Sequence, residues 1–283
     1  MLKNKDIFPL EKMAEVLDVA RSSYYLSQRP SKRCMENQKI VEKAREVYLK
    51  SRGTYGSPRI HASLQRLGIQ CSRPRVARLM KKANLQAKMV KAWKRTTKRK
   101  EEHSVEPNHL SQQFDVTEPN KVWVSDITYV KTEEGWLYVS VSLDLFSRKV
   151  VGLSMGASLE TSLVVKTVDQ AFTHRKRGKE LMHHSDRGCQ YTSKCFEGFM
   201  EEHDVKLSMS HKGCCYDNAA AKSFFHTLKT VHLDFCRYRT QVEAVIIEYT
   251  EVFYNRQRLH STLGYYTPVE YEKLWDIKQC SGF

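Results

Sequence analysis

The sequence lacks any apolar run long enough to cross a membrane, since a spanning helix needs about 20 such residues. Its first residues also lack the pattern of a signal peptide. Cysteine and histidine are present, but the 8 Cys form no CxxC pair and the 11 His form no array with Cys. We therefore expect a cytoplasmic protein with no membrane partner, with reduced thiols and without structural zinc.

Acidic residues are scarce in one part of the chain. Residues 1–100 hold 7 Asp and Glu against 26 Lys and Arg, a net charge of +19, whereas residues 101–283 hold 25 against 21, a net charge of −4. A basic segment joined to a near-neutral one predicts a polyanion-binding module attached to a second domain. A basic domain that is merely soluble is the less favoured alternative.

Short helices are predicted throughout residues 1–85, which we interpret as a helical DNA-binding region. Within residues 7–28 a first helix is followed by Ser22-Ser23, which could cap a second one. Residues 36–50 predict another helix. A turn at residues 53–58 precedes an apolar stripe of Ile60, Leu64 and Leu67, which Gly68 ends.

The next helix begins after Ser72 and carries a basic surface. Its apolar residues are Val76, Leu79, Met80 and Ala83, and its cations are Arg73, Arg75, Arg78, Lys81 and Lys82. Two short helices with cations on the second predict a helix-turn-helix at about 53–85 that places the second helix in a DNA groove. A solvated charged face is the alternative. Residues 86–118 follow as a basic linker, which could track phosphates or be solvated.

Residues 122–130 predict a central β-strand, because β-branched and aromatic residues dominate them. Asp126 then lies inside an apolar strand, where a carboxylate is costly unless it is paired or binds a metal. An Asp at a strand end, bonded to a nearby loop, is an equal alternative on this strand alone.

The following residues predict an α/β domain. Strands at 122–130, 136–143 and 149–153 form an antiparallel meander, and a helix follows at 159–174. A short strand at 181–184 ends at Ser185-Asp186, and Ser193 can cap the next helix. A strand at 205–208 precedes Asp217-Asn218, which can cap a helix running through Lys229.

Four segments resemble signatures of the insertion-sequence transposases related to retroviral integrases. They are WVSDITY at 123–129, HSDRGCQY at 184–191, parts of 208–225, and YNRQRLH at 254–260 with Leu263-Gly264 and Thr267-Pro268. The chain is most similar to the second-frame protein of the two-frame insertion-sequence family. The resemblance implies an α/β ribonuclease-H-like fold, a mixed five-stranded sheet flanked by helices, after a small all-α helix-turn-helix region. It places the integrase catalytic core at 119–232 and a C-terminal helical extension at 233–283.

The resemblance also implies a catalytic triad of Asp, Asp and Glu, with 35 residues between the last two. Asp126 and Asp186 match the first two, and we expect them to lie close together on adjacent strands. The third position holds Lys222. Asp217 does not replace the missing Glu, because five residues along a helix it faces another way. His183, His184, Tyr191 and Tyr216 line the site or simply pack.

The implied reaction is DNA strand cleavage followed by strand transfer, with two Mg²⁺ or Mn²⁺ ions about 3.5–4 Å apart. Asp126 would bridge both ions and Asp186 would hold one, while Lys229 would contact DNA nearby. Double-stranded DNA, as element ends and target, is the implied partner. A homo-oligomer on DNA, a first-frame helix-turn-helix fusion partner and a bacterial, nucleoid-associated location are implied as well.

Lys222 leaves three hypotheses about this chain. It is an insertion-sequence transposase that Lys222 impairs, or a catalytically inactive DNA-binding remnant or regulator of transposition. A structure-selective nuclease of the same fold is less favoured, because of the basic N-terminal module and the C-terminal motif.

Overall fold

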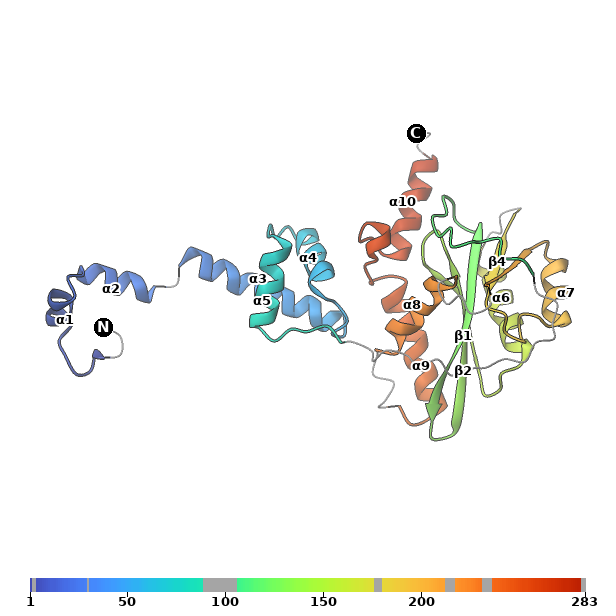
Figure 1. Cartoon of the computed structure of the whole chain (residues 1–283), viewed down its shortest axis with the longest axis horizontal. Helices are drawn as coiled ribbons and strands as arrows, with labels where there is room; N and C mark the ends of the chain where they lie inside the picture. Colours follow the sequence, from blue (N-terminus) through green and yellow to red (C-terminus); the bar gives the residue numbers. More distant parts are fainter. Residues whose placement is uncertain are drawn as a thin grey trace. The chain divides into compact units, whose positions relative to one another are not determined.

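The computed structural model describes residues 1, 4–29, 31–88, 106–175, 180–211, 217–230 and 236–280. The chain divides into two compact units, Met1–Gln86 and Ala87–Phe283 (Figure 1). Residues 89–105, most of the expected linker, lie outside the described residues. None of the described helices is long and apolar enough to cross a membrane.

The first unit is helical in its described parts, as the sequence predicts. Its helices are α1 (Leu10–Val16), α2 (Arg21–Gln28), α3 (Lys32–Lys50), α4 (Ser57–Arg66) and α5 (Arg73–Lys82). The prediction that Ser22-Ser23 caps the second helix is wrong, because α2 begins at Arg21 with Ala20 as its N-cap. Ala20 has no side chain that can accept a hydrogen bond, and both serines lie in the first turn.

The core of this unit forms where α3, α4 and α5 meet. Ile40 of α3, Ile60 and Leu64 of α4, and Val76 of α5 are almost fully buried. Gly68 follows α4 with φ of +76°, a left-handed conformation that costs glycine little, and so it ends the helix as predicted. Leu67 is not part of the apolar stripe, because it is the C-cap of α4 and is 58% exposed.

The second unit is built on a five-stranded sheet with strand order β3-β2-β1-β4-β5. The strands are β1 (Val122–Thr132), β2 (Gly135–Asp144), β3 (Val150–Gly156), β4 (Met182–Ser185) and β5 (Lys206–Met209). β1, β2 and β3 form the predicted antiparallel meander. β4 and β5 join them in parallel. β1 is therefore the middle strand, as its apolar faces predicted.

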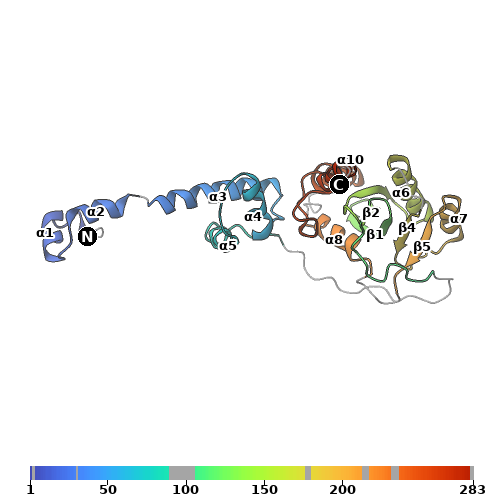
Figure 2. The ribbon, with the colours of Figure 1, turned by 90° about the horizontal axis from the view of Figure 1, so that it is seen from above.

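Helices cover both faces of this sheet (Figure 2). α6 (Thr161–His174) and α7 (Lys194–Glu202) bury their apolar residues with Trp123 in one cluster. α8 (Ala219–Leu228) contacts β1 and β2 and lies on the other side of the sheet (Figure 2). The predicted cap at Ser193 is confirmed, since its side chain accepts from the Phe196 amide. This layering is the ribonuclease-H-like arrangement that the sequence predicts.

The C-terminal segment is bonded to the sheet. It contains α9 (Arg239–Glu248), a π-helical turn (Tyr249–Tyr254), a 3₁₀ turn (Ser261–Leu263) and α10 (Pro268–Cys280). The side chain of Asn255 accepts a hydrogen bond from the Val150 amide at 3.0 Å and donates one to the Val150 carbonyl at 3.1 Å. Glu272 of α10 pairs with Arg175, which also pairs with the fully buried Asp144.

Candidate active site and DNA-binding surface

One aspartate lies on β1 and the other directly follows the neighbouring strand β4, so the expectation that both lie on strands holds only for Asp126. β1 and β4 pair in parallel, and the last pair in register is Val124 with His184. Two residues further on, β1 carries Asp126, and Asp186 follows directly after the end of β4. Because side chains alternate with a period of two, Asp126 extends the face of Val124. The register therefore brings together carboxylates that 59 residues separate in the sequence.

The surroundings of Asp126 raise the pKa of its carboxyl group. Burial raises it to about 7, and the charge of Asp186 is the next cause. The Ile127 amide, which donates to Oδ1 of Asp126 at 3.0 Å, lowers the pKa, as do the charges of Lys222 and Lys229. A carboxyl with a pKa of about 7 is partly protonated at neutral pH, and additional positive charge such as a bound metal ion would favour its ionised form.

Asp186 is exposed and is held by the turn that follows it. The Gly188 amide donates a hydrogen bond to Oδ1 of Asp186 at 2.8 Å. A Cβ at position 188 would lie 2.8 Å from that same oxygen. Position 188 thus has no room for a larger residue unless the Asp186 carboxylate moves.

Lys222 occupies the third position of the expected triad. It lies on the exposed side of α8, and its charge acts on Asp126. Lys229, the C-cap of α8, also acts on Asp126, while burial lowers its own pKa. Among the described residues, no group of three or more His, Cys, Asp and Glu could hold a metal ion.

Asp217 is engaged elsewhere. It is almost fully buried, and its carboxylate accepts hydrogen bonds from Asn108 Nδ2 at 3.0 Å, Gln112 Nε2 at 2.9 Å and the His211 amide at 2.8 Å. These bonds hold the segment before β1 against the loop before α8. Asn218 was expected only as a cap, yet its side-chain amide donates to the Ser125 carbonyl at 2.8 Å.

Three of the four candidate site-lining residues are packing residues. His183 bonds through Nε2 to Ser125 Oγ at 2.7 Å, and His184 bonds to Ser208 and Ser210 of the neighbouring strand and loop. Burial, the first cause in each case, lowers their pKa values to about 3 and about 4, so both are neutral. Tyr191 lies in the cluster around Trp123. Tyr216, like Lys212, Gly213 and the pair Cys214-Cys215, lies outside the described residues.

The cations of α5 fall on different sides of the helix. Arg73, Arg78, Lys81 and Lys82 are exposed, and at 100° per residue Arg78 and Lys81 point away from the buried Val76 and Met80. Arg75 instead reaches α3, where Nε donates to Asn37 Oδ1 at 2.9 Å and Nη2 to Glu36 Oε2 at 3.1 Å. Sequence reasoning missed this contact, because the partners lie 38 and 39 residues away.

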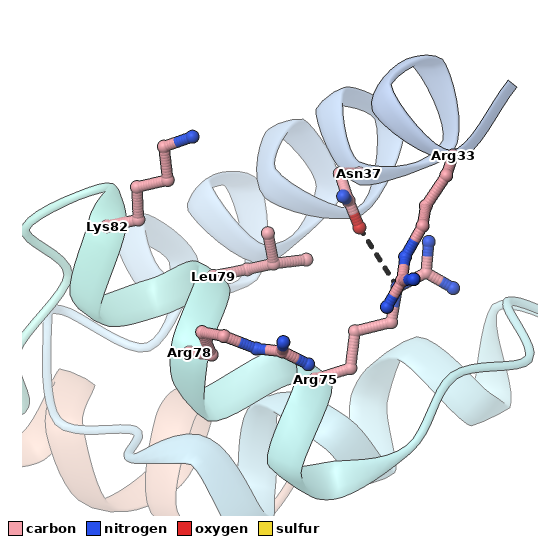
Figure 3. A pocket seen from close by; sticks show the side chains of 6 residues that line it. All are labelled: Arg33, Asn37, Arg75, Arg78, Leu79 and Lys82. Atoms are coloured by element: carbon pink, nitrogen blue, oxygen red, sulfur yellow. Dashed lines mark hydrogen bonds between the residues drawn. The ribbon is translucent and has the colours of Figure 1, made fainter. Parts of the chain in front are cut away.

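A groove of about 370 Å³ runs between α3 and α5. It is lined by Arg33, Asn37, Arg75, Arg78, Leu79 and Lys82 (Figure 3). Four of these side chains are cations, so the groove concentrates positive charge on one side of the helix pair. Helix α3 contributes Arg33, which the sequence analysis did not single out.

Comparison with known proteins agrees with both units. Models described as integrase core domain match residues 116–215 and 203–268, and one described as an HTH-like domain matches residues 35–93. The chain is 36% identical over 276 residues to transposase InsF of insertion sequence IS3A from Escherichia coli, covering 95% of this chain and 96% of that one. The chain belongs to the insertion-sequence transposases of this type.

Further relatives of this transposase family cover similar lengths. The chain is 38% identical over 250 residues to the transposase of element IS904 from Lactococcus lactis, which spans 88% of this chain and 99% of that one. It is 39% identical over 265 residues to an uncharacterized 31 kDa protein of insertion element IS600 from Shigella sonnei, spanning 92% and 97%.

Solved structures similar to this transposase family member include the HTLV-2 integrase catalytic core in complex with magnesium. That likeness has a TM-score of 0.42 and 16% identity over 54% of this chain and 95% of that one. The BIV integrase catalytic core has a TM-score of 0.43 and 16% identity over 56% and 99%.

Proposed function

We propose that this chain binds the ends of an insertion sequence and positions them for metal-dependent strand cleavage and strand transfer, and that Lys222 impairs the chemistry. The observation that carries the proposal is the parallel register that aligns Asp126 with Asp186, beside a lysine where the family pattern has Glu. DNA on the bacterial nucleoid, both element ends and target, is the substrate.

The available donors fit one divalent ion and fall short of two. Mg²⁺ and Mn²⁺ prefer carboxylate oxygens and water, and Asp126 with Asp186 supplies two such carboxylates. An ion bound there would stabilise the attacking or leaving oxygen in an in-line displacement at phosphorus. A second ion would need the third carboxylate, and at that position the chain presents an ammonium, which repels the ion.

Lys222 gives the site a different property. Its charge lowers the pKa of Asp126, so it stabilises the ionised carboxylate that a metal would otherwise stabilise. Together with Lys229, it also places positive charge where a DNA phosphate would approach. The site is therefore suited to holding a phosphate more than to cleaving it.

In this proposal, the first unit recognises the ends of the insertion sequence. Arg73, Arg78, Lys81 and Lys82 of α5 would contact phosphates or bases, and the cationic groove beside them would accept a phosphate. Arg75 takes the role of a positioning residue, since its guanidinium joins α5 to α3. Lys229 would contact DNA at the second unit.

We also propose that the chain acts as a homo-oligomer on DNA, with a first-frame helix-turn-helix protein as fusion partner. The support is the surface of α1 and α2, where Val16, Leu17 and Leu26 are 83%, 54% and 64% exposed. Three large apolar side chains exposed on or next to two short helices favour burial against another protein surface.

The competing function is a catalytically inactive DNA-binding remnant or regulator of transposition. Lys222 itself favours it, because DNA binding needs only the basic surfaces. Restoring the acid separates the two functions. We expect the unaltered chain to show little Mg²⁺- or Mn²⁺-dependent donor cleavage. Lys222→Glu should raise the rates of cleavage and strand transfer by orders of magnitude, because each decrease of about 1.4 kcal/mol in the activation free energy raises the rate tenfold.

The matched control is the double variant Lys222→Glu/Asp126→Asn, which should bind DNA but remain inactive. All three proteins should still bind cognate ends, because the cations of α5 are unchanged. Robust cleavage by the unaltered chain would refute the impairment. A Lys222→Glu variant that folds, binds ends and metal with its partner present, and yet stays inert, would favour the regulator.

A further inference from the structure

The outer end of the β1–β2 hairpin carries aromatic side chains on one face. Tyr129 pairs with Tyr138 across the strands, and Lys131 pairs with Trp136. Since alternate residues share a face, these four residues form one surface, here called the hairpin aromatic face. The rings of Tyr129 and Trp136 meet edge-to-face with centroids 5.0 Å apart. Even so, the two residues are 39% and 45% exposed.

The exposure belongs to one face only. On the other face of the same hairpin, Thr128, Thr132, Leu137 and Val139 are buried, and α8 contacts both strands. The hairpin end projects beside α9 (Figure 1). The hairpin is therefore amphipathic, with its apolar inner face covered and its aromatic face presented to solvent.

The hairpin end is fixed in place. The Glu133 amide donates to the Arg237 carbonyl at 2.9 Å, and the Arg239 amide donates to Glu134 Oε2 at 2.7 Å. Glu133 also pairs with Arg237 at 3.7 Å. These contacts give both acidic side chains partners and hold the aromatic rings on a preformed support, so that little ordering is needed on binding.

A cation links this face to the carboxylates. Lys229 Nζ lies 5.8 Å from the ring centroid of Tyr129, and its charge lowers the pKa of Asp126. Tyr129 is three residues beyond Asp126 on β1, about 10 Å along the strand and, because side chains alternate, on the opposite face of the sheet. β4 pairs with β1 only as far as Val124, so a DNA strand would pass from one face to the other at the edge of β1, where the side chain of Lys229 reaches from the end of α8 to Tyr129. At the duplex rise of about 3.4 Å for each nucleotide, the distance along β1 corresponds to about three nucleotides, and a path around the strand edge needs at least that number.

We propose that the hairpin aromatic face stacks unpaired bases of the DNA strand whose phosphate lies at Asp126 and Asp186. Aromatic rings stack on any base, so the site would be tolerant of sequence, and Lys131 and Lys229 would attract the backbone. The inference rests on the proposed function, because it assigns a second contact to the same bound DNA. It concerns single-stranded nucleotides, whereas α5 concerns the duplex.

The test uses the full chain and three DNA probes. They are a blunt duplex, the same duplex with a single-stranded extension of about three nucleotides, and the same extension with abasic sites. Because stacking on an aromatic ring adds measurably to affinity for each base, we expect the extension to tighten binding roughly tenfold or more. Abasic sites should remove the gain, since phosphates alone cannot stack. Both 3′ and 5′ extensions are measured, and either suffices.

Variants of Trp136 and of one distant aromatic residue supply the matched controls. Trp136→Ala should bind the blunt duplex normally and lose the gain from the extension, whereas Trp136→Phe should keep most of it. Tyr25→Ala removes a 57% exposed aromatic of α2 and should leave the gain from the extension unchanged. A direct signal is a loss of tryptophan fluorescence on binding the extension, present in the unaltered chain and reduced in Trp136→Phe.

Three results would overturn the inference. Equal binding of extensions with and without bases would refute the stacking site without affecting the proposal that the chain recognises duplex DNA. Trp136→Ala that folds normally by thermal unfolding and keeps the full gain would do the same. A dimer in the unaltered chain that Trp136→Ala dissociates, without any effect of bases, would make the face a protein interface. If the unaltered chain binds no duplex at all, the proposed function fails together with this site.

Discussion

The side-chain amide of Asn218 donates a hydrogen bond to the backbone carbonyl of Ser125 at 2.8 Å. This bond connects the start of α8 to the residue immediately before Asp126, so the helix that carries Lys222 is fixed to the strand that carries the first carboxylate. Both residues are almost fully buried.

Asn218→Asp tests this link. The substitution removes the donor and places a carboxylate against a carbonyl oxygen in a buried position. We expect the free energy of unfolding to fall by about 1–3 kcal/mol. Denaturant unfolding measures the loss, and Ser223→Ala, at an exposed position of α8, should leave stability nearly unchanged. Equal stability of the two variants would contradict a structural role for Asn218.

Gly188→Ala tests the support of Asp186. The added Cβ would lie 2.8 Å from Oδ1 of Asp186, and we expect the carboxylate to shift. Affinity for Mn²⁺, measured by calorimetry in the Lys222→Glu background, should then fall. Gly198→Ala in α7 is the control, because a Cβ there meets nothing within 4 Å, and alanine in a helix stabilises by roughly 0.5–1 kcal/mol. Unchanged metal affinity in Gly188→Ala would show that Asp186 does not depend on this turn.

Replacing Arg75 or Arg78 by Ala should have different effects on DNA binding and on stability. Arg78→Ala should weaken DNA binding and reduce the slope of log affinity against log salt by about 1, with little effect on stability. Arg75→Ala loses its bonds to Asn37 and Glu36, and we expect it to lower the stability of the first unit by about 1 kcal/mol. Salt-dependent binding and thermal unfolding measure the two effects. Identical profiles for both variants would refute the division of roles.

His183 should make stability depend on pH. Burial, and then the charge of His184, lower its pKa from 6.5 to about 3 in the folded state. The unfolded chain therefore takes up a proton between these values while the folded chain does not. The stabilisation that neutral His183 contributes is complete above about pH 6.5. It falls by about 1.4 kcal/mol for each pH unit as the pH is lowered from about 6.5 toward about 3.

Urea unfolding at about pH 7.5 and about pH 5 measures this dependence. His183→Gln removes the titrating group, so its unfolding free energy should vary less between the two conditions. A variant with the same dependence as the unaltered chain would assign the effect to other groups.

Local patterns explain what sequence reasoning predicted well. The order of strands and helices follows from runs of β-branched residues and from helical periodicity, and the positions of Asp126 and Asp186 follow from motifs around them. The contacts that hold the site could not be read in the same way. Asn218 and Ser125 are 93 residues apart, and nothing near either residue indicates the other.

The same reason applies to residues whose roles were open or wrongly read. Arg75 was counted with the outward cations of α5, because its partners on α3 are distant in sequence. Asp217 was read as a possible cap, but in the folded chain it gathers three donors. For His183 and His184 the sequence left two roles open, lining the site or packing in the core. Both are fully buried in the folded chain, which identifies them as packing residues. Residue type alone cannot distinguish these cases.

The pairing of Arg175 with both Asp144 and Glu272 has a consequence for synthesis on the ribosome. Glu272 and Asn255 are translated after all five strands, and both bind groups at or next to β2 and β3. The strands of the nascent second unit therefore emerge before these contacts can form, and Arg175 lacks Glu272 until α10 has been translated. The first unit contains all of its own core and can fold long before, so a growing chain acquires its basic helices before its carboxylate site is complete.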